Sequence, residues 1–269
     1  MKALLRQPLR PWLDQVVVVG GWAHHLYRLH TFAQHLRYEP LATLDADIAL
    51  PTRFKVTGDE IYKRLASNGF KAEFLGHHKP PAAHYRLSDS GPEFYAEFVA
   101  PLAGSTVSRT GKPKATHRVG GVSLQNLRYV EVLLATPWSV TLSASNGFPL
   151  ANETRVQIAN PVSFIVQKIL IHRRRKRDGR AKDILYMQDT IDTFATRIDD
   201  LRAGKYPVRV AREQCSHYRR RTRIAVWRDH RLDSRRIANR PRQGSDSRSD
   251  SGDMQSGVHA DFPTRFQGS

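Results

Sequence analysis

Two aspartates, Asp45 and Asp47, have the type and spacing needed for chemistry. In TLDADIALP, residues 43–51, apolar residues alternate with them as in a half-buried β-strand, although strands disfavour aspartate. Neighbouring carboxylates raise each other's pKa unless a cation lies between them. The pair therefore predicts half of a divalent-cation site. The alternative interpretation is a solvated strand face with ion pairs.

Paired glycines follow a strand-like run earlier in the chain. The run VVVVGG, residues 16–21, predicts a buried strand that ends in a tight turn at Gly20 and Gly21. Apolar residues then recur at steps of three and four, which predicts an amphipathic helix. They are Trp22, Leu26, Leu29, Ala33 and Leu36. Backbone N–H groups and the dipole at such a helix start can receive a phosphate.

The aspartate pair and the glycine turn together indicate nucleotide chemistry. Carboxylates at positions i and i+2 of a strand point the same way and can share one or two Mg²⁺ ions, which neutralise and orient the phosphates of a nucleotide. A glycine turn that opens a helix, followed about 25 residues later by a D-x-D strand, is more specific than either feature alone.

VVVVGGWAHHLYRLH followed by TLDADIAL resembles the core of the DNA polymerase β-like nucleotidyltransferase superfamily. That superfamily has a glycine-glycine or glycine-serine turn that opens a helix, and then a strand in which two aspartates alternate with apolar residues. Within it, the chain looks most like the bacterial nucleotidyltransferase toxins and abortive-infection proteins. The resemblance covers roughly residues 15–195.

The superfamily usually supplies a third carboxylate from a neighbouring strand, and Glu97 in EFYAEFVAPL fits that role. Tyr95, Glu97 and Val99 are expected to share one face of this strand. Glu93 has the same parity and is the reserve candidate. The alternative for Glu97 is a single acid on an exposed strand face.

The toxin-like relatives have an Arg and a Thr ahead of the D-x-D, a Lys on a helix after a proline, and a K-D pair after a basic stretch. The matching residues here are Arg37, Thr43, Pro161, Lys168, Arg180, Lys182 and Asp183. The nucleotide-binding residues that the resemblance implies are Gly20, Gly21, Arg37, Thr43, Lys168 and Lys182. The implied metal ligands are Asp45, Asp47 and Glu97, and the implied catalytic residues are Asp45, Asp47, Glu97, Lys168 and Asp183.

The implied reaction is in-line attack of an acceptor on the α-phosphate of a nucleoside triphosphate (NTP), with pyrophosphate leaving. Mg²⁺ at the aspartates is expected to stabilise the phosphate charge, while Glu97 acts as base or as ligand of a second ion. Lys168 offers a point charge to the triphosphate, unless it only complements a helix end, and Asp183 holds that lysine or orients the acceptor. The first turn lacks the serine that touches the β- or γ-phosphate in many relatives.

The order of elements predicts an α+β fold, a small mixed β-sheet with packed helices and a C-terminal helical part. A helix is expected at residues 59–67, and another at NPVSFIVQKILIHRRR, with Asn160 as N-cap and Pro161 first. A further helix is expected from about Ala181. Segments with a period of two predict strands at KAEFLG, HYRLSD, EFYAEFVAPL, RYVEVLL and WSVTLS. We expect a nucleotidyltransferase core at 1–155 and the helical part at 156–204.

Residues 205–269 form a basic tail of low complexity, with 15 Lys and Arg, 7 Asp and Glu and few large apolar residues. The composition predicts that this tail is mostly disordered. Translation in a shifted reading frame is an alternative origin for it.

The chain is strongly basic, with a formal net charge of +18, which favours partners that carry phosphate. Residues 1–204 alone hold 28 Lys and Arg against 18 Asp and Glu. Cys215 is the only cysteine, so an intrachain disulfide is excluded and a reducing compartment fits. No apolar run approaches the roughly 20 residues of a membrane span, and the N-terminus does not resemble a signal peptide. We therefore expect a cytoplasmic protein without a membrane partner.

The leading hypothesis is an Mg²⁺-dependent, toxin-like nucleotidyltransferase that adds NMP to an RNA such as tRNA or to a protein hydroxyl. A cognate antitoxin is a partner that the resemblance suggests. A small-molecule acceptor such as an aminoglycoside is the alternative within the same chemistry, although cationic acceptors favour an acidic cleft. A catalytically inactive RNA-binding relative, or a degraded gene product, is the alternative from another class.

Two other patterns have ordinary explanations beside functional ones. The basic run HRRRKRDGR, residues 172–180, is either an RNA contact or a solvated turn that complements a helix dipole. The pairs His24-His25 and His77-His78 have no partner at ligand spacing, and adjacent histidines on a helix point in different directions. We do not expect them to bind metal.

Overall fold

The structure is a computed structural model and describes most of the first 197 residues. The described residues are 1–197 and 201, without 42, 78, 88–93, 103, 106, 108–110 and 112–113. They all belong to one unit, Met1–Arg221. The predicted tail at 205–269 and the reserve candidate Glu93 lie outside the described residues.

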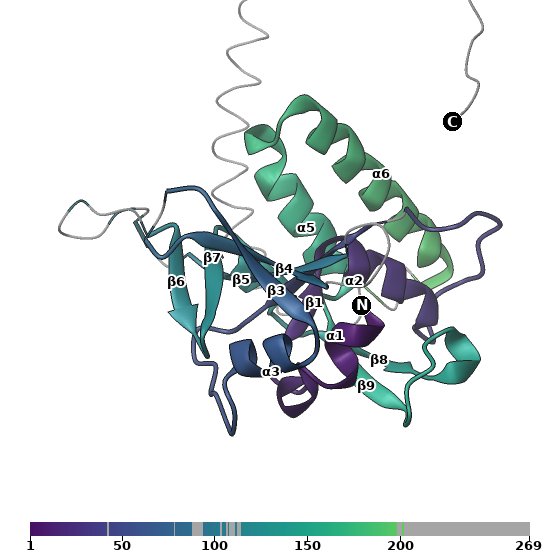
Figure 1. Ribbon diagram of the computed structural model, residues 1–269. Helices are drawn as coiled ribbons and strands as arrows, with labels where there is room; N and C mark the ends of the chain where they lie inside the picture. Colours follow the sequence, from purple (N-terminus) through teal and green to yellow (C-terminus); the bar gives the residue numbers. More distant parts are fainter. Residues whose placement is uncertain are drawn as a thin grey trace, which may run out of the picture. The chain divides into compact units, whose positions relative to one another are not determined.

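A mixed β-sheet is the centre of the fold (Figure 1). Its strands are β1 Val17–Val19, β2 Asp45–Ala49, β3 Phe70–Leu75, β4 Ala82–Leu87, β5 Tyr95–Pro101, β6 Thr116–Val119, β7 Val122–Leu127, β8 Trp138–Leu142 and β9 Thr154–Ile158. They run in the order β3-β4-β5-β2-β1-β9-β8, while β7 pairs with β5 and β6. β1 is antiparallel to β2 and parallel to β9, and β2 is parallel to β5.

Six α-helices and five short 3₁₀ segments accompany this sheet in the described part of the chain. The helices are α1 Lys2–Arg6, α2 Gly20–Leu26, α3 Ile61–Ser67, α4 Val130–Leu133, α5 Pro161–Ile171 and α6 Arg177–Thr193. The 3₁₀ segments are η1 Arg10–Trp12, η2 Tyr27–Leu29, η3 Ala144–Asn146, η4 His172–Arg174 and η5 Ala195–Arg197. The predicted α+β fold is confirmed. None of the described helices has the length and apolar character needed to cross a membrane.

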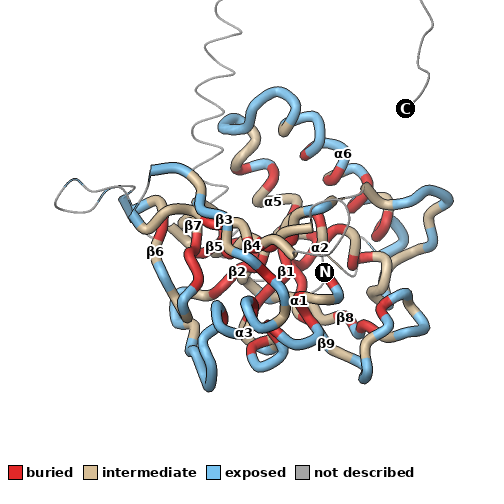
Figure 2. The backbone as a smooth tube through the Cα atoms, viewed as in Figure 1, coloured by how far each residue is buried: buried red, intermediate tan, exposed pale blue. Residues whose placement is uncertain are grey.

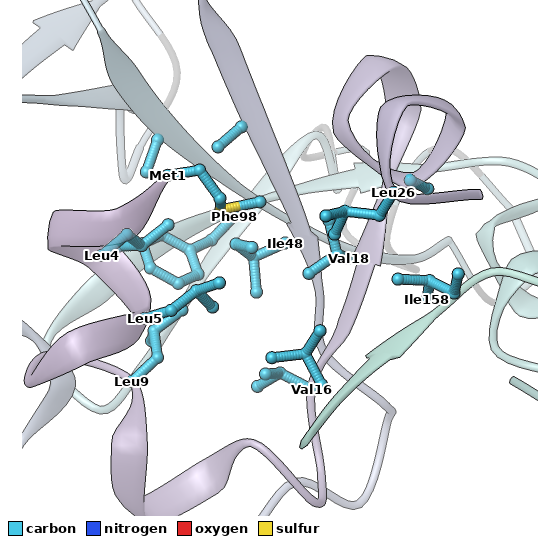
Figure 3. Close-up of a cluster of buried hydrophobic side chains, with 14 of the residues drawn as sticks. Met1, Leu4, Leu5, Leu9, Val16, Val18, Leu26, Ile48, Phe98 and Ile158 are labelled. Carbon is cyan, nitrogen blue, oxygen red and sulfur yellow. The ribbon is translucent and has the colours of Figure 1, made fainter. Parts of the chain in front are cut away.

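One face of the central strands carries the main hydrophobic core. Ile48 and Phe98 pack there against Leu4 and Leu5 of α1, and Val18 packs near Leu26 of α2 (Figure 3). The central strands are buried, whereas the turn between α5 and α6 is exposed (Figure 2). Removing this much apolar surface from water is the main force that holds α1, α2 and α3 against the sheet.

The opposite face of the sheet is apolar at one end only. A smaller cluster consists of Val17, Val19, Ala49, Val99, Val130, Leu133 and Ala159. Because side chains alternate along a strand, Asp45 and Asp47 lie on the same face as Ala49. This face therefore changes from apolar to acidic along β2.

The start of α5 agrees with the sequence prediction. The Asn160 side chain accepts a hydrogen bond from the Ser163 backbone N–H at 2.8 Å, and Pro161 is the first helical residue. This cap satisfies a backbone donor that the helix cannot satisfy itself. Helix α6 begins at Arg177, earlier than the expected Ala181, and lies beside α5 (Figure 1).

Two local predictions were wrong because tertiary contacts override the pattern. The segment RYVEVLL was expected to be a strand, but Tyr129 adopts a left-handed φ of 68° and α4 follows at Val130–Leu133. There Val130 and Leu133 pack on the smaller cluster. The helix that was expected to reach Leu36 ends at Leu26, and the 3₁₀ segment η2 follows it. The chain then turns to α6, where the Gln34 backbone N–H donates to the Thr193 carbonyl at 2.9 Å.

Candidate active site

Strand pairing brings the three predicted acids together. In the parallel register of β2 and β5, Asp47 lies opposite Glu97, and Asp45 lies opposite Tyr95. Paired residues of neighbouring strands share a face, so all three carboxylates project from the same side of the sheet. Ala46 and Ile48, which alternate with the aspartates, are fully buried on the other side.

The glycine turn lies directly against these acids. Val19, the last residue of β1, pairs with Asp47, and Gly20 follows it with a φ of +62°. A Cβ atom at Gly20 would lie 2.0 Å from Asp47 Oδ2, so only glycine fits here. The backbone that opens α2 and the Asp47 carboxylate are therefore immediate neighbours.

Thr43 fills the space beside the second glycine. A Cβ atom at Gly21 would lie 2.8 Å from the side-chain atoms of Thr43. A serine at position 21 would need the space that Thr43 occupies. The Thr43 hydroxyl donates a hydrogen bond to Asp45 Oδ1. Thr43 thus fixes the orientation of one acid as well as the shape of the turn.

Burial, together with the neighbouring carboxylates, changes the protonation of Asp47. Burial raises the pKa of Asp47 to about 7, and the charges of Asp45 and Glu97 add to this, while Lys168 and Arg175 act in the opposite direction. Burial and neighbouring like charges both disfavour the charged form of a carboxyl group. The folded protein therefore contains an unfavourable negative charge at Asp47 that a bound cation would relieve.

Both oxygens of Glu97 are occupied by side chains from neighbouring strands. His84 Nε2 lies 2.6 Å from Glu97 Oε1, and Gln125 Nε2 donates to Oε2 at 3.0 Å. Burial raises the pKa of Glu97, and the nearby His84 lowers it. The His84 ring also stacks on Tyr95, with 4.4 Å between ring centroids. No sequence pattern indicated His84 or Gln125, because their proximity to Glu97 depends on the pairing of β4, β5 and β7.

Lys168 and Asp183 meet between α5 and α6. Lys168 is only 5% exposed, and its Nζ donates to Asp183 Oδ1 at 2.7 Å. Arg175 Nε donates to Asp183 Oδ2 at 3.2 Å. Burial lowers the pKa of Lys168, whereas Asp183 and, more weakly, Asp47 raise it. The predicted Lys168–Asp183 contact exists, and Lys168 is close enough to Asp47 for their charges to interact.

Arg37 and Lys182 were expected to bind nucleotide, and neither contacts the three acids among the described residues. Lys182 is exposed, and its Nζ is 5.5 Å from the centre of the Tyr186 ring. Arg37 is exposed between η2 and β2 and, among the described residues, forms no hydrogen bond or ion pair with the carboxylates. Arg180 is exposed as well. A cavity of about 550 Å³ between α3 and the β6–β7 turn is lined by none of the candidate site residues.

The two aspartates fit a divalent ion that also contacts substrate. In the described part of the chain, no group of three or more His, Cys, Asp or Glu side chains is arranged to hold a metal by itself. Mg²⁺ is usually bound by one or two carboxylates together with water and substrate phosphates. Asp45 and Asp47 can supply such a pair, and the raised pKa of Asp47 marks the position where a cation would be favourable.

Comparison with protein-family models gives a match. A family model described as nucleotidyltransferase matches residues 8–206, which is most of the chain and includes every candidate site residue. Comparison with curated proteins gives no match. The matched range contains the mixed sheet, the acids of β2 and β5, and the helices that carry Lys168 and Asp183. The chain therefore belongs to a nucleotidyltransferase family and is a transferase.

Proposed function

We propose that this nucleotidyltransferase transfers the NMP group of an NTP to an RNA acceptor in an Mg²⁺-dependent reaction. The observation that carries the proposal is the position of Asp47. Its carboxylate lies against the Gly20 backbone, opposite Glu97, and within electrostatic reach of Lys168. Acids for a cation, backbone N–H groups for phosphate and a buried ammonium group thus meet at one place.

Asp45 and Asp47 are the residues that would hold Mg²⁺. When bound, the ion supplies charge neutralisation at the phosphates of the NTP. Thr43 keeps Asp45 in position through its hydrogen bond. Gly20 and Gly21 leave the backbone open to the phosphates because no side chain covers it.

Lys168 and Asp183 act as a unit in this proposal. Lys168 places a positive charge near the NTP phosphates, and Asp183, with Arg175, keeps the ammonium group in one orientation. A fixed charge in a site sheltered from water stabilises the phosphate charge that develops during transfer. Glu97 is held by His84 and Gln125 and is proposed as the base that accepts the acceptor proton, or as a further metal ligand.

The exposed turn between α5 and α6 supports RNA as the acceptor. Arg173, Arg174, Lys176 and Arg177 are all exposed there, next to Arg175, which contacts Asp183. A row of cations beside a reacting centre attracts a polyanion. The toxin-like role, a cognate antitoxin and a cytoplasmic location belong to the proposal through the resemblance described above.

Labelling of cellular RNA tests the proposal. The purified chain should transfer label from α-³²P-labelled NTPs to RNA in a total RNA extract when Mg²⁺ is present, and chelation with EDTA should stop the transfer. Asp47→Ala should reduce the labelling by about 10³-fold or more, because the ion loses a ligand. Asp59→Asn, a change at an exposed acid outside the site, should label like the wild type.

Two results would contradict parts of this proposal. Equal labelling by the wild type and Asp47→Ala would reject the assigned active site. Label that enters protein in a lysate but not RNA would keep the chemistry and reject the RNA acceptor. An assay of aminoglycoside resistance in cells tests the small-molecule acceptor separately.

A further inference from the structure

The Glu97 carboxylate is held by side chains from strands on either side of β5, and His84 of β4 makes the closer contact. Arg86 pairs with Tyr95 in the antiparallel register of β4 and β5. Two positions further along the same register, His84 lies opposite Glu97, on the face that carries the acids. His84 Nε2 is 2.6 Å from Glu97 Oε1, and the two side chains are 19% and 18% exposed. The contact is therefore largely sheltered from water.

Stacking fixes His84 as a hydrogen-bond donor to Glu97. An ionised carboxylate offers only acceptors, so His84 Nε2 must carry the hydrogen that lies between the two groups. The His84 ring stacks on Tyr95, with 4.4 Å between the ring centroids and 18° between the ring planes. Tyr95 belongs to β5, two residues before Glu97. The strand that carries the carboxylate therefore also orients the ring that bonds it.

Gln125 of β7 donates the second hydrogen bond to Glu97. Its Nε2 donates to Glu97 Oε2 at 3.0 Å, and β7 pairs with β5. The terminal torsion of a glutamate is broad, so a carboxylate whose oxygens are both free can rotate about it. With one N–H donor on each oxygen, the plane of the Glu97 carboxylate is fixed.

The two donors hold Glu97 without holding the other acids. Among the described residues, neither His84 nor Gln125 forms a hydrogen bond or ion pair with Asp45 or Asp47. The Thr43 hydroxyl holds Asp45 instead. The support of Glu97 is thus separate from the support of the aspartates.

The orientation of Glu97 matters for the proposed transfer step. The acceptor oxygen forms a bond to the α-phosphorus, the bond to the pyrophosphate oxygen breaks, and the acceptor proton passes to Glu97. A general base works only within hydrogen-bond reach of the proton that it removes. A displacement of about 1 Å can lower the rate of such a step by about a hundredfold.

We propose that His84 is a positioning residue, which holds the Glu97 carboxylate in the orientation that receives the acceptor proton. The inference rests on the proposed function and assigns Glu97 to the acceptor, whereas Asp45 and Asp47 are left to the metal and the nucleotide. Loss of the His84 hydrogen bond should therefore slow the transfer without weakening the binding of Mg²⁺-NTP.

Two substitutions of His84 separate its hydrogen bond from its ring. His84→Phe keeps a planar ring beside Tyr95 and removes the donor, and it should lower the maximum rate of label transfer to RNA by about tenfold to a hundredfold. The Kd of Mg²⁺-NTP, measured by calorimetry on the full chain, should not change. His84→Gln keeps a side-chain N–H donor and should recover most of the lost rate. His117→Phe, at a half-buried histidine of β6, is the control and should leave both quantities unchanged.

A double variant tests whether His84 acts through Glu97. Glu97→Gln alone should lower the maximum rate by about 10²-fold or more, because the base is lost. Adding His84→Phe should lower the rate no further, because the group that His84 positions is already gone. A residue that only supports the fold would lower the rate again.

Each other outcome overturns the inference in a recognisable way. An unchanged rate in His84→Phe means that Glu97 acts without His84. Weaker binding of Mg²⁺-NTP in this variant places Glu97 at the metal and not at the acceptor. An equal loss of rate in His84→Gln, or a further loss in the double variant, makes His84 a structural residue. If His84→Phe does not fold, His84→Asn, whose shorter side chain cannot reach Glu97, takes its place in both tests.

The two proposals can fail separately. A wild-type chain that binds no Mg²⁺-NTP and labels no acceptor rejects the proposed function, and the role of His84 with it. A wild type that binds and transfers, beside a His84→Phe variant with the same maximum rate, rejects the role of His84 alone.

Discussion

At the scale of single residues, the charged form of Asp47 is the form that the proposed metal site needs, and the same charge destabilises the folded protein. Its pKa is raised to about 7, so the folded protein retains a proton there that the unfolded chain loses near pH 4. The folded state binds more protons between these two values, and its stability therefore falls as the pH rises through that window. Above about pH 7, Asp47 is charged in the folded protein, and the whole of this destabilisation is present.

Asp47→Asn should remove this pH-dependent cost. At about pH 8 and without Mg²⁺, the variant should exceed the wild type in free energy of unfolding by about 1 kcal/mol, after allowance for solvent screening. Near pH 5 the difference should be much smaller, because the wild-type Asp47 is then protonated in the fold. Urea unfolding at both pH values measures it. Added Mg²⁺ should stabilise the wild type and not the variant, and an equal difference at both pH values would contradict this account.

The residue types of the site were predictable only in part. The spacing of Asp45 and Asp47, with apolar residues between them, predicted two acids on one face of a strand, and the register of β2 agrees. Lys168 and Asp183 were predicted as site residues through a resemblance, because no local rule links residues on separate helices, and the structure shows only that the two side chains are hydrogen-bonded.

At the scale of elements, a buried polar contact ties α2 to α6. His24 Nε2 approaches Asp189 Oδ2, and Arg28 Nη2 lies 2.8 Å from Asp189 Oδ1. Burial lowers the pKa of His24 to about 4, against the raising effect of Asp189, while Arg28 and His25 lower it further. The contact holds the helix of the glycine turn against the helix of Asp183 and Tyr186.

Acid should destabilise the fold through the buried His24. Between about pH 6.5 and pH 4 the unfolded chain protonates His24 and the folded chain does not, so stability falls as the pH falls through this window. Between pH 6.5 and pH 4.5 the wild type should lose more free energy of unfolding than His24→Gln does. The two losses should differ by about 2 kcal/mol. Urea unfolding at the two pH values measures this, with His172→Gln at the end of α5 as control. A loss in His24→Gln as large as in the wild type would exclude His24 as the cause.

Elements were predictable where local pattern and tertiary packing agree. Asn160 and Pro161 predicted the start of α5 because capping is a local interaction. The alternation of Val130 and Val132 misled the prediction of a strand, since α4 is set by Tyr129 and by the apolar cluster that it covers. The early end of α2 was not predictable either, because the chain leaves the helix to reach α6, where the Gln34 backbone N–H bonds the Thr193 carbonyl.

At the scale of the whole molecule, positive charge is the dominant property. The formal charge is +18, and residues 1–204 contribute 28 Lys and Arg against 18 Asp and Glu. Composition alone predicted a phosphate-bearing partner but not the surface that meets it. The structure adds an exposed basic turn between α5 and α6, beside the residues that hold Lys168.

Salt dependence of RNA binding should locate this surface. A triple variant should reduce the steepness of log affinity against log salt concentration by about 2, because RNA binding then releases fewer counterions. The variant combines Arg173→Gln, Arg174→Gln and Arg177→Gln. Arg175 is left unchanged, since it bonds Asp183. The control removes the same charge elsewhere, at the exposed residues Arg53, Lys63 and Lys71. Equal slopes for both triple variants would mean that RNA meets the protein without a preferred surface.

The pairing of β1 with both β2 and β9 has a consequence for how the enzyme is made. One three-residue strand joins segments from opposite ends of the domain, and Lys168 lies more than 120 residues after Asp47. A nascent chain that already contains Asp45 and Asp47 still lacks Lys168 and the helix α6 that packs beside it. The full set of charges of the proposed site comes together only after α6 has left the ribosome, so a nascent chain that ends before α6 cannot assemble that site.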